Sequence, residues 1–289
     1  MPELPEVEVL RCHLEPLLVG KRVTGFQVLK PRVVRPETPR QLQGGVAGCS
    51  IKGVGRQGKF LWLDFAQARS RKTFPLTIHL GMTGNFLINA QKMGHNDNKH
   101  VRLRFKMSDY SEIDYVDIRK FGFFKLINPQ KGEIKKLKAE LGPDALSDEF
   151  DTKYLQESLK NRITNIKSAL LNQKIVGGIG NIYASEALFR AKISPMMESR
   201  KVVKNKIKTG DLISSIKFIL HDAIKVGGST IKDHKNLKGE SGYFQYKFNV
   251  YNRENMTCNS QNCDAKIKKI VQTGRSTFYC TKCQKMRNR

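Results

Sequence analysis

The chain has 289 residues, enough for two domains with separate hydrophobic cores. Its 52 Lys and Arg residues against 26 Asp and Glu residues give a net charge of +26, so we expect a polyanionic partner such as nucleic acid, with an acidic membrane surface as the competing partner. No apolar run reaches the length of a membrane span, and the N-terminus has acids where a signal peptide needs basic residues, so we expect a soluble, intracellular protein.

The first six residues allow two interpretations. Removal of Met1 would expose the secondary amine of Pro2, whose pKa starts from the α-amino value of about 7.7 to 8.0 and which could attack an electrophilic carbon. Glu3 follows directly and could move protons for that attack. Alternatively, the prolines only begin a helix and the acids complement its dipole. Apolar residues at three- and four-residue spacing from Val7 onward predict an amphipathic helix that ends at Gly20.

Between about residues 22 and 127 the apolar period changes to two, which is typical of strands with one buried face. Six segments show this period: 23–29, 51–54, 60–65, 101–105, 113–117 and 123–127. Turn residues separate these segments, so we expect an antiparallel sandwich. One turn, residues 55–58, puts Lys59 just past its tip, where a lysine is most often a solvated edge residue.

Two loops of this region have residues that could contact DNA. The segment 79–84 ends a strand between glycines and should present Met82. The segment 117–122 interleaves Arg119 with Phe121. Exposed Met and Phe side chains beside Arg can wedge between bases while the cation contacts a base edge, although such apolar side chains are more often core residues.

The second half of the chain changes to a helical pattern. Residues 128–150 are polar and contain a Gly-Pro pair, which indicates a linker between domains. A helical period follows, and then a glycine-rich turn, residues 176–180, leads into a second helix that Asn181 would cap. Such a turn offers backbone N–H groups to a phosphate, although an ordinary helical hairpin has the same pattern. Residues 227–244 lack a clear period and predict a long loop, which is often functional.

Four of the six cysteines lie in the last 32 residues: Cys258, Cys263, Cys280 and Cys283. Four thiolates at this spacing predict a closed structural zinc site in a reducing compartment, and two disulfides are the alternative. Residues 247–289 contain ten Lys and Arg against one Glu and one Asp, so their net charge is 10 − 2 = +8. A zinc-bound hairpin this basic indicates nucleic-acid binding.

Six motifs, in chain order, resemble the formamidopyrimidine-DNA glycosylase family, and the resemblance runs from Pro2 to Cys283. They are Met1–Glu8, the hairpin with Lys59, His79–Met82, Arg119–Gly122, Gly180–Tyr183, and Gly274–Thr277 with its cysteines. The resemblance implies an α+β fold of two domains: an N-terminal antiparallel β-sandwich with a flanking helix, and a C-terminal helix-two-turn-helix domain with a zinc β-hairpin finger. The expected divisions are a catalytic domain at 1–130, a linker at 131–150, the helical domain with a lesion-capping loop (227–244) at 151–246, and the zinc finger at 247–289.

The resemblance implies a bifunctional DNA glycosylase and AP lyase of base-excision repair, which removes 8-oxoguanine and formamidopyrimidines and cuts the strand by β,δ-elimination. Pro2 would form a Schiff base with C1′ of the damaged nucleoside, Glu3 would move protons, and Glu6 would support them. Lys59 would donate a proton for β-elimination and Arg275 for δ-elimination. A monomer in the cytoplasm or nucleoid would bind double-stranded DNA with oxidised bases or abasic sites, and one structural Zn²⁺ would be the cofactor.

The family also implies how DNA is held, since the damaged base must leave the stack to be reached. Met82, Arg119 and Phe121 would fill the vacated space, with Arg119 facing the orphaned partner base. Further DNA-binding positions correspond to His79, Lys167, Asn181 and Tyr251, and the loop over the flipped purine includes Ser229, Thr230 and Tyr243.

Two departures and two alternatives accompany this interpretation. The first cysteine pair encloses four residues where the family usually has two, and Lys120 stands where a second arginine is common. An endonuclease VIII type enzyme shares the Pro2 and Glu3 chemistry but prefers oxidised pyrimidines, and it usually has glycine where Leu4 stands here. A non-catalytic, zinc-dependent module that binds damaged DNA would explain the charge and the cysteines, but not Pro2, Glu3 and Lys59.

Overall fold

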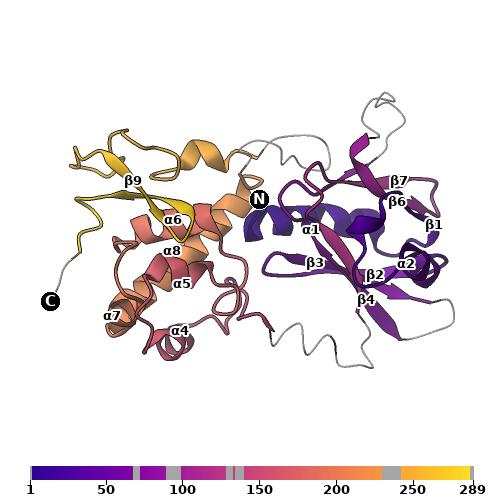
Figure 1. The fold of residues 1–289 in the computed structure, drawn as a ribbon, viewed down its shortest axis with the longest axis horizontal. Helices are drawn as coiled ribbons and strands as arrows, with labels where there is room; N and C mark the ends of the chain where they lie inside the picture. The colour runs from indigo at the N-terminus through magenta and orange to yellow at the C-terminus, as the bar shows by residue number, and fades with distance from the viewer. Residues whose placement is uncertain are drawn as a thin grey trace. The chain divides into compact units, whose positions relative to one another are not determined.

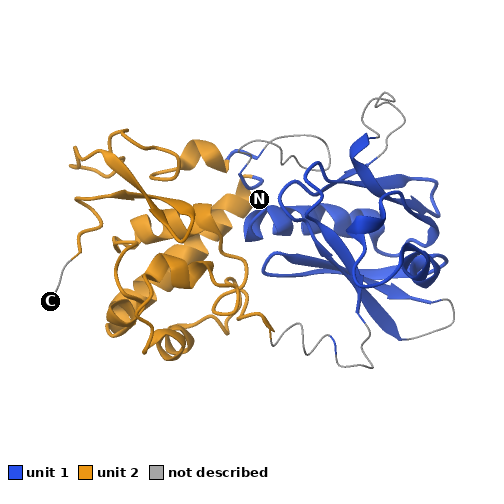
Figure 2. Cartoon of the chain, viewed as in Figure 1, with its two compact units in different colours: residues 1–138, 227–243 blue, residues 139–226, 244–289 orange. Residues whose placement is uncertain are grey.

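The structure is a computed structural model that describes residues 2–67, 72–88, 99–127, 133, 140–229 and 242–286. By its contacts the chain divides into two compact units (Figure 2). The first comprises 1–138 with 227–243, and the second comprises 139–226 with 244–289. Among the helices described, none has both the length and the apolar character that crossing a membrane requires.

The first unit contains two four-stranded antiparallel sheets and a long N-terminal helix, α1 (Leu4–Leu18) (Figure 1). One sheet has the order β1 (Val23–Val28), β6 (Val101–Met107), β7 (Glu112–Val116) and β5 (Asn85–Ile88). The other has the order β2 (Ser50–Gln57), β3 (Phe60–Ala66), β4 (Thr73–His79) and β8 (Phe123–Leu126). A short helix, α2 (Pro39–Val46), and a 3-10 turn, η1 (Pro31–Val33), follow β1. The predicted sandwich with its flanking helix is confirmed.

The sequence pattern missed β5 and α2, and for β4 it indicated only that a strand ends at the segment 79–84, without its range. Strand β4 has four consecutive buried residues in its centre and therefore no alternation of apolar and polar side chains. Strand β5 has only four residues, too few for a period to be recognised. Both pair as regular antiparallel strands, β4 with β3 and β5 with β7.

One hydrophobic core joins both sheets to α1. Inward-facing side chains of β3 and β6, such as Leu63 and Phe105, pack in the same cluster as Leu14 of α1. We expect truncation of Leu14 to Ala to cost about 2–5 kcal/mol, because a fully buried leucine leaves a cavity. Helix α1 is thus fixed on the sheets along its length, and this holds its first turn, with Glu3 and Glu6, in the buried part of the unit.

The second unit contains helices and a two-stranded hairpin. The helices are α4 (Thr152–Leu159), α5 (Ile166–Leu171), α6 (Asn181–Arg190), α7 (Ser199–Val203) and α8 (Lys206–Lys225), followed by the 3-10 turn η4 (Phe244–Lys247). The hairpin pairs β9 (Ile267–Gln272) with β10 (Arg275–Cys280). Helix α8 packs against α4, α6 and α7, and α6 packs against β10. The hairpin therefore contacts the helices directly within this unit.

Two predicted boundaries differ from the structure. The linker was expected to reach residue 150, but residues 141–150 fold with the second unit: Gly142 N–H donates to the Gln173 carbonyl, Gly177 N–H donates to the Pro143 carbonyl, and Phe150 is fully buried. The loop at 227–244 was expected in the helical domain, but its described residues 227–229 and 242–243 belong by their contacts to the first unit. Backbone N–H groups of Gly142, Gly177 and Ser229 bond residues that are distant in the chain, and these bonds determine which unit each segment joins. Local composition does not predict such contacts.

Candidate active site, DNA contacts and metal centre

The N-terminal residues Pro2, Glu3 and Glu6 are all buried. Glu3 is the N-cap of α1 and forms a capping box with Glu6, whose Oε2 accepts a hydrogen bond from the Glu3 backbone N–H at 2.8 Å. The helix-entry interpretation is therefore correct for these residues, and it is compatible with the chemical one. A carboxyl group buried beside a chain start is the environment in which a proton-transferring acid can be tuned.

Glu6 also binds a residue more than 200 positions away. Its Oε1 accepts from the backbone N–H of Ser229 at 2.8 Å and from the Ser229 hydroxyl at 3.1 Å. Gly228 precedes it at φ +78°, and a Cβ there would lie 2.9 Å from Glu6 Oε1. A Cβ on Gly242 would collide with the Gly228 carbonyl, so the two ends of the predicted capping loop meet closely. Glycine is required where two backbones and a carboxylate approach this closely.

Of the other two residues predicted for the capping loop, only Tyr243 is among the described residues. Tyr243 is largely exposed. Thr230 lies outside the described residues. Ser229 is connected to the N-terminal carboxylates through Glu6.

Lys59 lies in the two-residue turn between β2 and β3, one position earlier in the hairpin than predicted, because β2 continues to Gln57. Its side chain is 8% exposed, so it is not the solvated edge residue that its position favoured. His79 is the cross-strand partner of Phe60, the residue after Lys59. Burial, and then the charge of Lys59, lower the pKa of His79 below its ordinary value of 6.5. The backbone N–H of Gly81 donates to His79 Nδ1 at 3.0 Å, so a neutral imidazole here carries its proton on Nε2.

The loops 79–84 and 117–122 are joined by one buried carboxylate. Asp117 accepts from the Thr83 hydroxyl at 2.6 Å through Oδ1 and from the Gly122 backbone N–H at 2.8 Å through Oδ2. Thr83 Oγ1 in turn accepts from the Arg119 backbone N–H at 2.9 Å. Each loop is thereby fixed to the other, and the backbone of Arg119 is held at the junction.

The three predicted wedge residues differ in exposure. Phe121 is 54% exposed and Arg119 is exposed, whereas Met82 is partly buried. The Arg119 guanidinium carbon lies 5.2 Å from the centre of the Phe121 ring, a cation–π contact. Phe121 is therefore not the core residue that its type alone favoured. An exposed aromatic ring covered by a guanidinium offers both a stacking face and a base-reading cation.

In the second unit, Lys167 of α5 connects the helices to the zinc hairpin. Its ammonium donates to Asn181 Oδ1 at 2.6 Å, to Thr277 Oγ1 at 2.7 Å and to the Ser276 carbonyl at 3.0 Å, and the side chain is only 1% exposed. Asn181 Nδ2 also donates to the Ser276 carbonyl at 2.9 Å. Asn181 was expected to cap α6, but Gly180 is the N-cap, because the amide is committed to the lysine and the hairpin.

A second buried acid holds Tyr251. Glu186 of α6 accepts from the backbone N–H groups of Asn249, Val250 and Tyr251 at 2.9, 3.0 and 2.8 Å. The Tyr251 ring packs edge-on against Phe278 of β10. Burial raises the pKa of Glu186, although the backbone bonds counteract the rise. The carboxylate fixes the segment from which Tyr251 projects.

Arg275 begins β10 directly after a turn with two left-handed residues, Thr273 at φ +46° and Gly274 at φ +72°. It is exposed. The hydroxyls of Ser168 and Thr273 form a 2.8 Å hydrogen bond, which ties this turn to α5. Arg275 is thus an exposed cation on a turn that is itself fixed to the helices.

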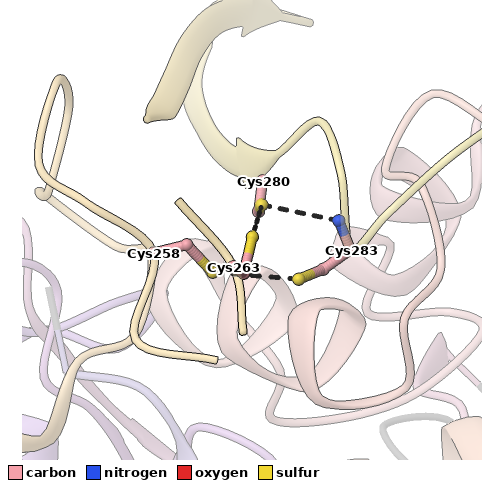
Figure 3. A group of neighbouring side chains, drawn as sticks. All are labelled: Cys258, Cys263, Cys280 and Cys283. Atoms are coloured by element: carbon pink, nitrogen blue, oxygen red, sulfur yellow. Dashed lines mark hydrogen bonds between the residues drawn. The ribbon is translucent and has the colours of Figure 1, made fainter. Parts of the chain in front are cut away.

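The four C-terminal cysteines converge, as Figure 3 shows. Their sulfur atoms all lie within 4.8 Å of one another, and none forms a disulfide. The pairs Cys258–Cys283 and Cys263–Cys280 have Sγ–Sγ distances of 3.8 and 3.6 Å. A tetrahedral zinc with Zn–S bonds of about 2.3 Å requires sulfurs about 3.8 Å apart, so this set fits the ion. The wider first spacing does not prevent convergence, since Asn262 adopts φ +59° in the intervening turn.

Four further residues that hold the site together, Asp117, Thr83, Glu186 and Arg56, were not expected from the sequence. Glu186 had a usable signal, because it is an acid in the fully buried run 182–189 of α6. Asp117 follows an apolar strand directly, but nothing in the local sequence shows which loop it bonds. Contacts between residues 34 and 65 positions apart, such as these, cannot be read from spacing.

Family models match most of the chain. The model described as "Formamidopyrimidine-DNA glycosylase N-terminal domain" matches residues 1–124, and "Formamidopyrimidine-DNA glycosylase H2TH domain" matches residues 141–235. A third, "Zinc finger found in FPG and IleRS", matches residues 261–285, a range that begins after Cys258.

Relatives cover the chain from end to end. The formamidopyrimidine-DNA glycosylases of Roseobacter denitrificans and Dinoroseobacter shibae are 38% and 39% identical, each over 99% of this chain and 100% of the relative. Among solved structures, a Lactococcus lactis FPG mutant in complex with a Fapy-dG containing DNA is 34% identical, with a TM-score of 0.87 over 98% of this chain and 100% of that one. A Lactococcus lactis Fpg complex with an abasic site containing DNA has a TM-score of 0.86 over 98% and 99%. This chain therefore belongs to the formamidopyrimidine-DNA glycosylase family.

Proposed function

We propose that this chain is a bifunctional DNA glycosylase and AP lyase that excises oxidised purines, 8-oxoguanine and formamidopyrimidines, and then cuts the strand by β,δ-elimination. The observation that carries the proposal is the buried chain start, where Pro2 precedes two buried carboxyl groups, Glu3 and Glu6. The Lactococcus lactis relatives bound to Fapy-dG and abasic-site DNA support the substrate class.

The chemistry follows from the groups at that site. The free amine of processed Pro2 attacks C1′, the bond from C1′ to the base breaks, and the electron pair leaves with the base, which is protonated as it departs. Glu3 moves protons on the sugar during this exchange. Protonation of O4′ breaks the C1′–O4′ bond and opens the sugar ring, which leaves an iminium between Pro2 and C1′. The iminium acidifies the C2′ proton, so its removal expels the 3′ phosphate. Lys59 supplies a proton in this β-elimination, and Arg275 supplies one in the δ-elimination that releases the 5′ phosphate.

The DNA contacts are proposed from the same family positions. Arg119, Phe121 and Met82 fill the space left by the flipped base, and Arg119 faces the orphaned partner. The phosphates around the lesion are held by His79, Asn181 and Tyr251, with Lys59 and Arg275 beside them, and the buried Lys167 positions Asn181. The segment with Ser229, Thr230 and Tyr243 covers the flipped purine. This segment is anchored at Ser229, which donates a hydrogen bond to Glu6.

Four thiolates would fill the coordination sphere of the zinc and leave no position for substrate, so the zinc site is structural. Binding of the metal would contribute folding energy to the β9–β10 hairpin. Through Lys167 and Asn181 the hairpin is joined to α5 and α6, so the zinc site also stabilises the helical DNA contacts. We propose that the protein acts as a monomer in the cytoplasm or nucleoid, where DNA is accessible and thiols stay reduced.

A preference for oxidised pyrimidines is the second candidate. A Lactococcus lactis Fpg complex with an oxidized pyrimidine containing DNA, with a TM-score of 0.86, favours testing it. The purine preference is supported by Leu4, which stands where the pyrimidine enzymes usually have glycine, and by the long segment 227–244.

The test is borohydride trapping on duplexes that contain 8-oxoguanine opposite cytosine, an oxidised pyrimidine, or an abasic site. We expect a covalent adduct on Pro2, mapped by peptide mass, and faster trapping with the purine lesion. A variant with one alanine inserted before Pro2 blocks the amine and should lose the adduct, whereas Pro5→Ala should keep it. Tight binding without an adduct on any of the three duplexes would show a non-catalytic DNA-binding module instead.

A further inference from the structure

A cavity of about 500 Å³, lined by several basic residues, lies in the first unit beside the loop 117–122. Its walls come from η1, from the residues that begin β6, and from that loop. The basic side chains that line it are Lys30, Arg32, Lys99, His100, Arg102 and Lys120. None of the catalytic or DNA-binding residues named above is among those described as lining it.

Arg102 is the fixed element of this cavity. It is 4% exposed, and its guanidinium donates to two neutral acceptors, the Asp117 carbonyl at 2.8 Å and the Lys99 carbonyl at 3.3 Å. Within the described part of the chain it forms no ion pair. The nearby Asp117 carboxylate is already bonded by Thr83 and Gly122. Because an arginine stays charged at all accessible pH values, a buried guanidinium without a counter-ion favours an anion in the adjacent cavity.

The other basic residues that line the cavity also lack a carboxylate partner among the described residues. Of the residues that the structure describes, no carboxylate pairs with Lys30, Arg32 or Lys120, although lysines elsewhere in this unit do pair, as Lys106 does with Glu112. Lys120 has φ +62°, a left-handed conformation that is unfavourable for a non-glycine residue. Cations that line one cavity without an acid partner among the described residues match an anion that accepts several hydrogen bonds.

We propose that this cavity binds a phosphate group, and that a backbone phosphodiester of duplex DNA is the ligand. The loop 117–122 forms one wall, and its exposed Arg119 and Phe121 are proposed above to enter the DNA. A phosphate held by Arg102, Arg32 and Lys120 would therefore fix the loop 117–122 on the duplex. The choice of DNA rests on the proposed function, whereas the choice of phosphate rests on the cavity alone.

The test uses the exposed cations, so that folding is preserved. The affinity of wild type and of Lys30→Ala/Arg32→Ala for a duplex with an uncleavable abasic analogue is measured between about 50 and 300 mM salt. Loss of one phosphate contact should make the slope of log K against log salt shallower by about 0.9. Lys204→Ala/Lys206→Ala removes the same charge from exposed positions of the second unit and should leave the slope unchanged.

A methylphosphonate scan then identifies the phosphate. Each duplex carries one neutral methylphosphonate linkage. At one position this linkage should weaken DNA binding by wild type but not by Lys30→Ala/Arg32→Ala. If instead every methylphosphonate weakens wild type and the variant equally, the ligand is not a DNA phosphate. If millimolar inorganic phosphate then raises the melting temperature of wild type but not of the variant, the ligand is a free phosphoanion. Absence of both effects, or an equal change of slope in the control variant, overturns the site. Borohydride trapping on wild type is read in parallel, so that failure of the proposed function is seen separately.

Discussion

Arg56 donates a hydrogen bond from Nε to the Glu8 carboxylate at 2.7 Å and another from Nη1 to the Gly58 carbonyl at 3.0 Å. The first contact reaches α1, and the second reaches the residue before Lys59. The hairpin that carries the proposed β-elimination donor is thereby attached to the helix that begins with the proposed catalytic carboxyl groups. Burial raises the pKa of Glu8, but hydrogen bonds from Arg11 and Arg56 outweigh it and hold the pKa below the ordinary value, so the pair stays ionic at neutral pH.

We predict that Arg56→Lys slows strand cleavage at a preformed abasic site by about tenfold or more, because lysine cannot bridge Glu8 and Gly58 at once and Lys59 loses its position. Single-turnover kinetics on an abasic-site duplex measure this effect, and affinity should stay within about twofold. Arg11→Lys is the matched control, since Arg11 pairs with Glu8 but does not contact the hairpin. Equal slowing in both variants would show that only the charge on Glu8 matters.

A second prediction concerns Lys167. Lys167→Met keeps the buried chain length but leaves Asn181, Thr277 and the Ser276 carbonyl without their cation, so we expect a loss of about 2–4 kcal/mol of unfolding free energy. Chemical denaturation followed by circular dichroism measures it. Ser168→Ala removes the exposed contact to Thr273 between the same two elements and should cost less than about 1 kcal/mol. A Lys167→Met protein as stable as wild type would contradict this account of the junction.

Glu186→Gln gives the third prediction. The amide places an N–H group where the carboxylate accepts backbone hydrogen bonds from the segment 249–251, so we expect weaker DNA binding through a displaced Tyr251. The pKa of Glu186 is raised by burial, so the folded state binds this proton more tightly than the unfolded state does. Between the ordinary pKa of 4.5 and the raised one, this acid makes stability fall as pH rises. The variant should lack that component in unfolding curves measured from pH 4 to 7. The same pH dependence of stability in Glu186→Gln and wild type would contradict a raised pKa of Glu186 in the folded state.

Local signals explain what could be predicted from the sequence. The period-two strands of the sandwich, the apolar face of α1 and the spacing of the cysteines each depend on residues close together in the chain. The turn was predicted at 55–58, but its two central residues are Gly58 and Lys59, because glycine marks turns without fixing which residue is central. Short-range chemistry thus predicts element types well and exact positions less well.

Long-range bonds account for what could not be predicted. Asn181 has the sequence signature of a cap, but its amide instead contacts Lys167 and Ser276, the second of them 95 residues away. Burial of Lys59 depends on packing of the whole first unit. Asp117 bonds Thr83, which lies 34 residues earlier. In each case a tertiary partner outweighs the local preference, and a single sequence does not name that partner.

Metal removal provides the fourth prediction. Chelation with an excess of a strong zinc ligand should release one zinc per chain, measured with a colorimetric indicator, and should unfold the β9–β10 hairpin, whose own apolar cluster is small. DNA affinity should fall at least tenfold and return on adding zinc. Cys12→Ser, which alters an exposed thiol outside the cluster, should bind one zinc as wild type does. Retained affinity in the metal-free protein would show that the hairpin does not contribute to binding.

The last prediction concerns acid. The pKa of His79 is lowered by burial and then by the charge of Lys59, so the folded state resists protonation that the unfolded state accepts below about pH 6.5. Stability contributed by the neutral imidazole is therefore complete above that pH and falls as the pH drops toward the folded pKa. Protonation also destroys the acceptor for the Gly81 N–H.

We accordingly expect the unfolding free energy of wild type to decrease between pH 7.5 and 5.5 by more than that of His79→Gln, which cannot titrate. Urea denaturation at three pH values measures the difference. His13→Gln removes an exposed imidazole from α1 and should follow the wild-type profile. Parallel profiles for wild type and His79→Gln would show that burial and Lys59 do not lower the pKa of this ring.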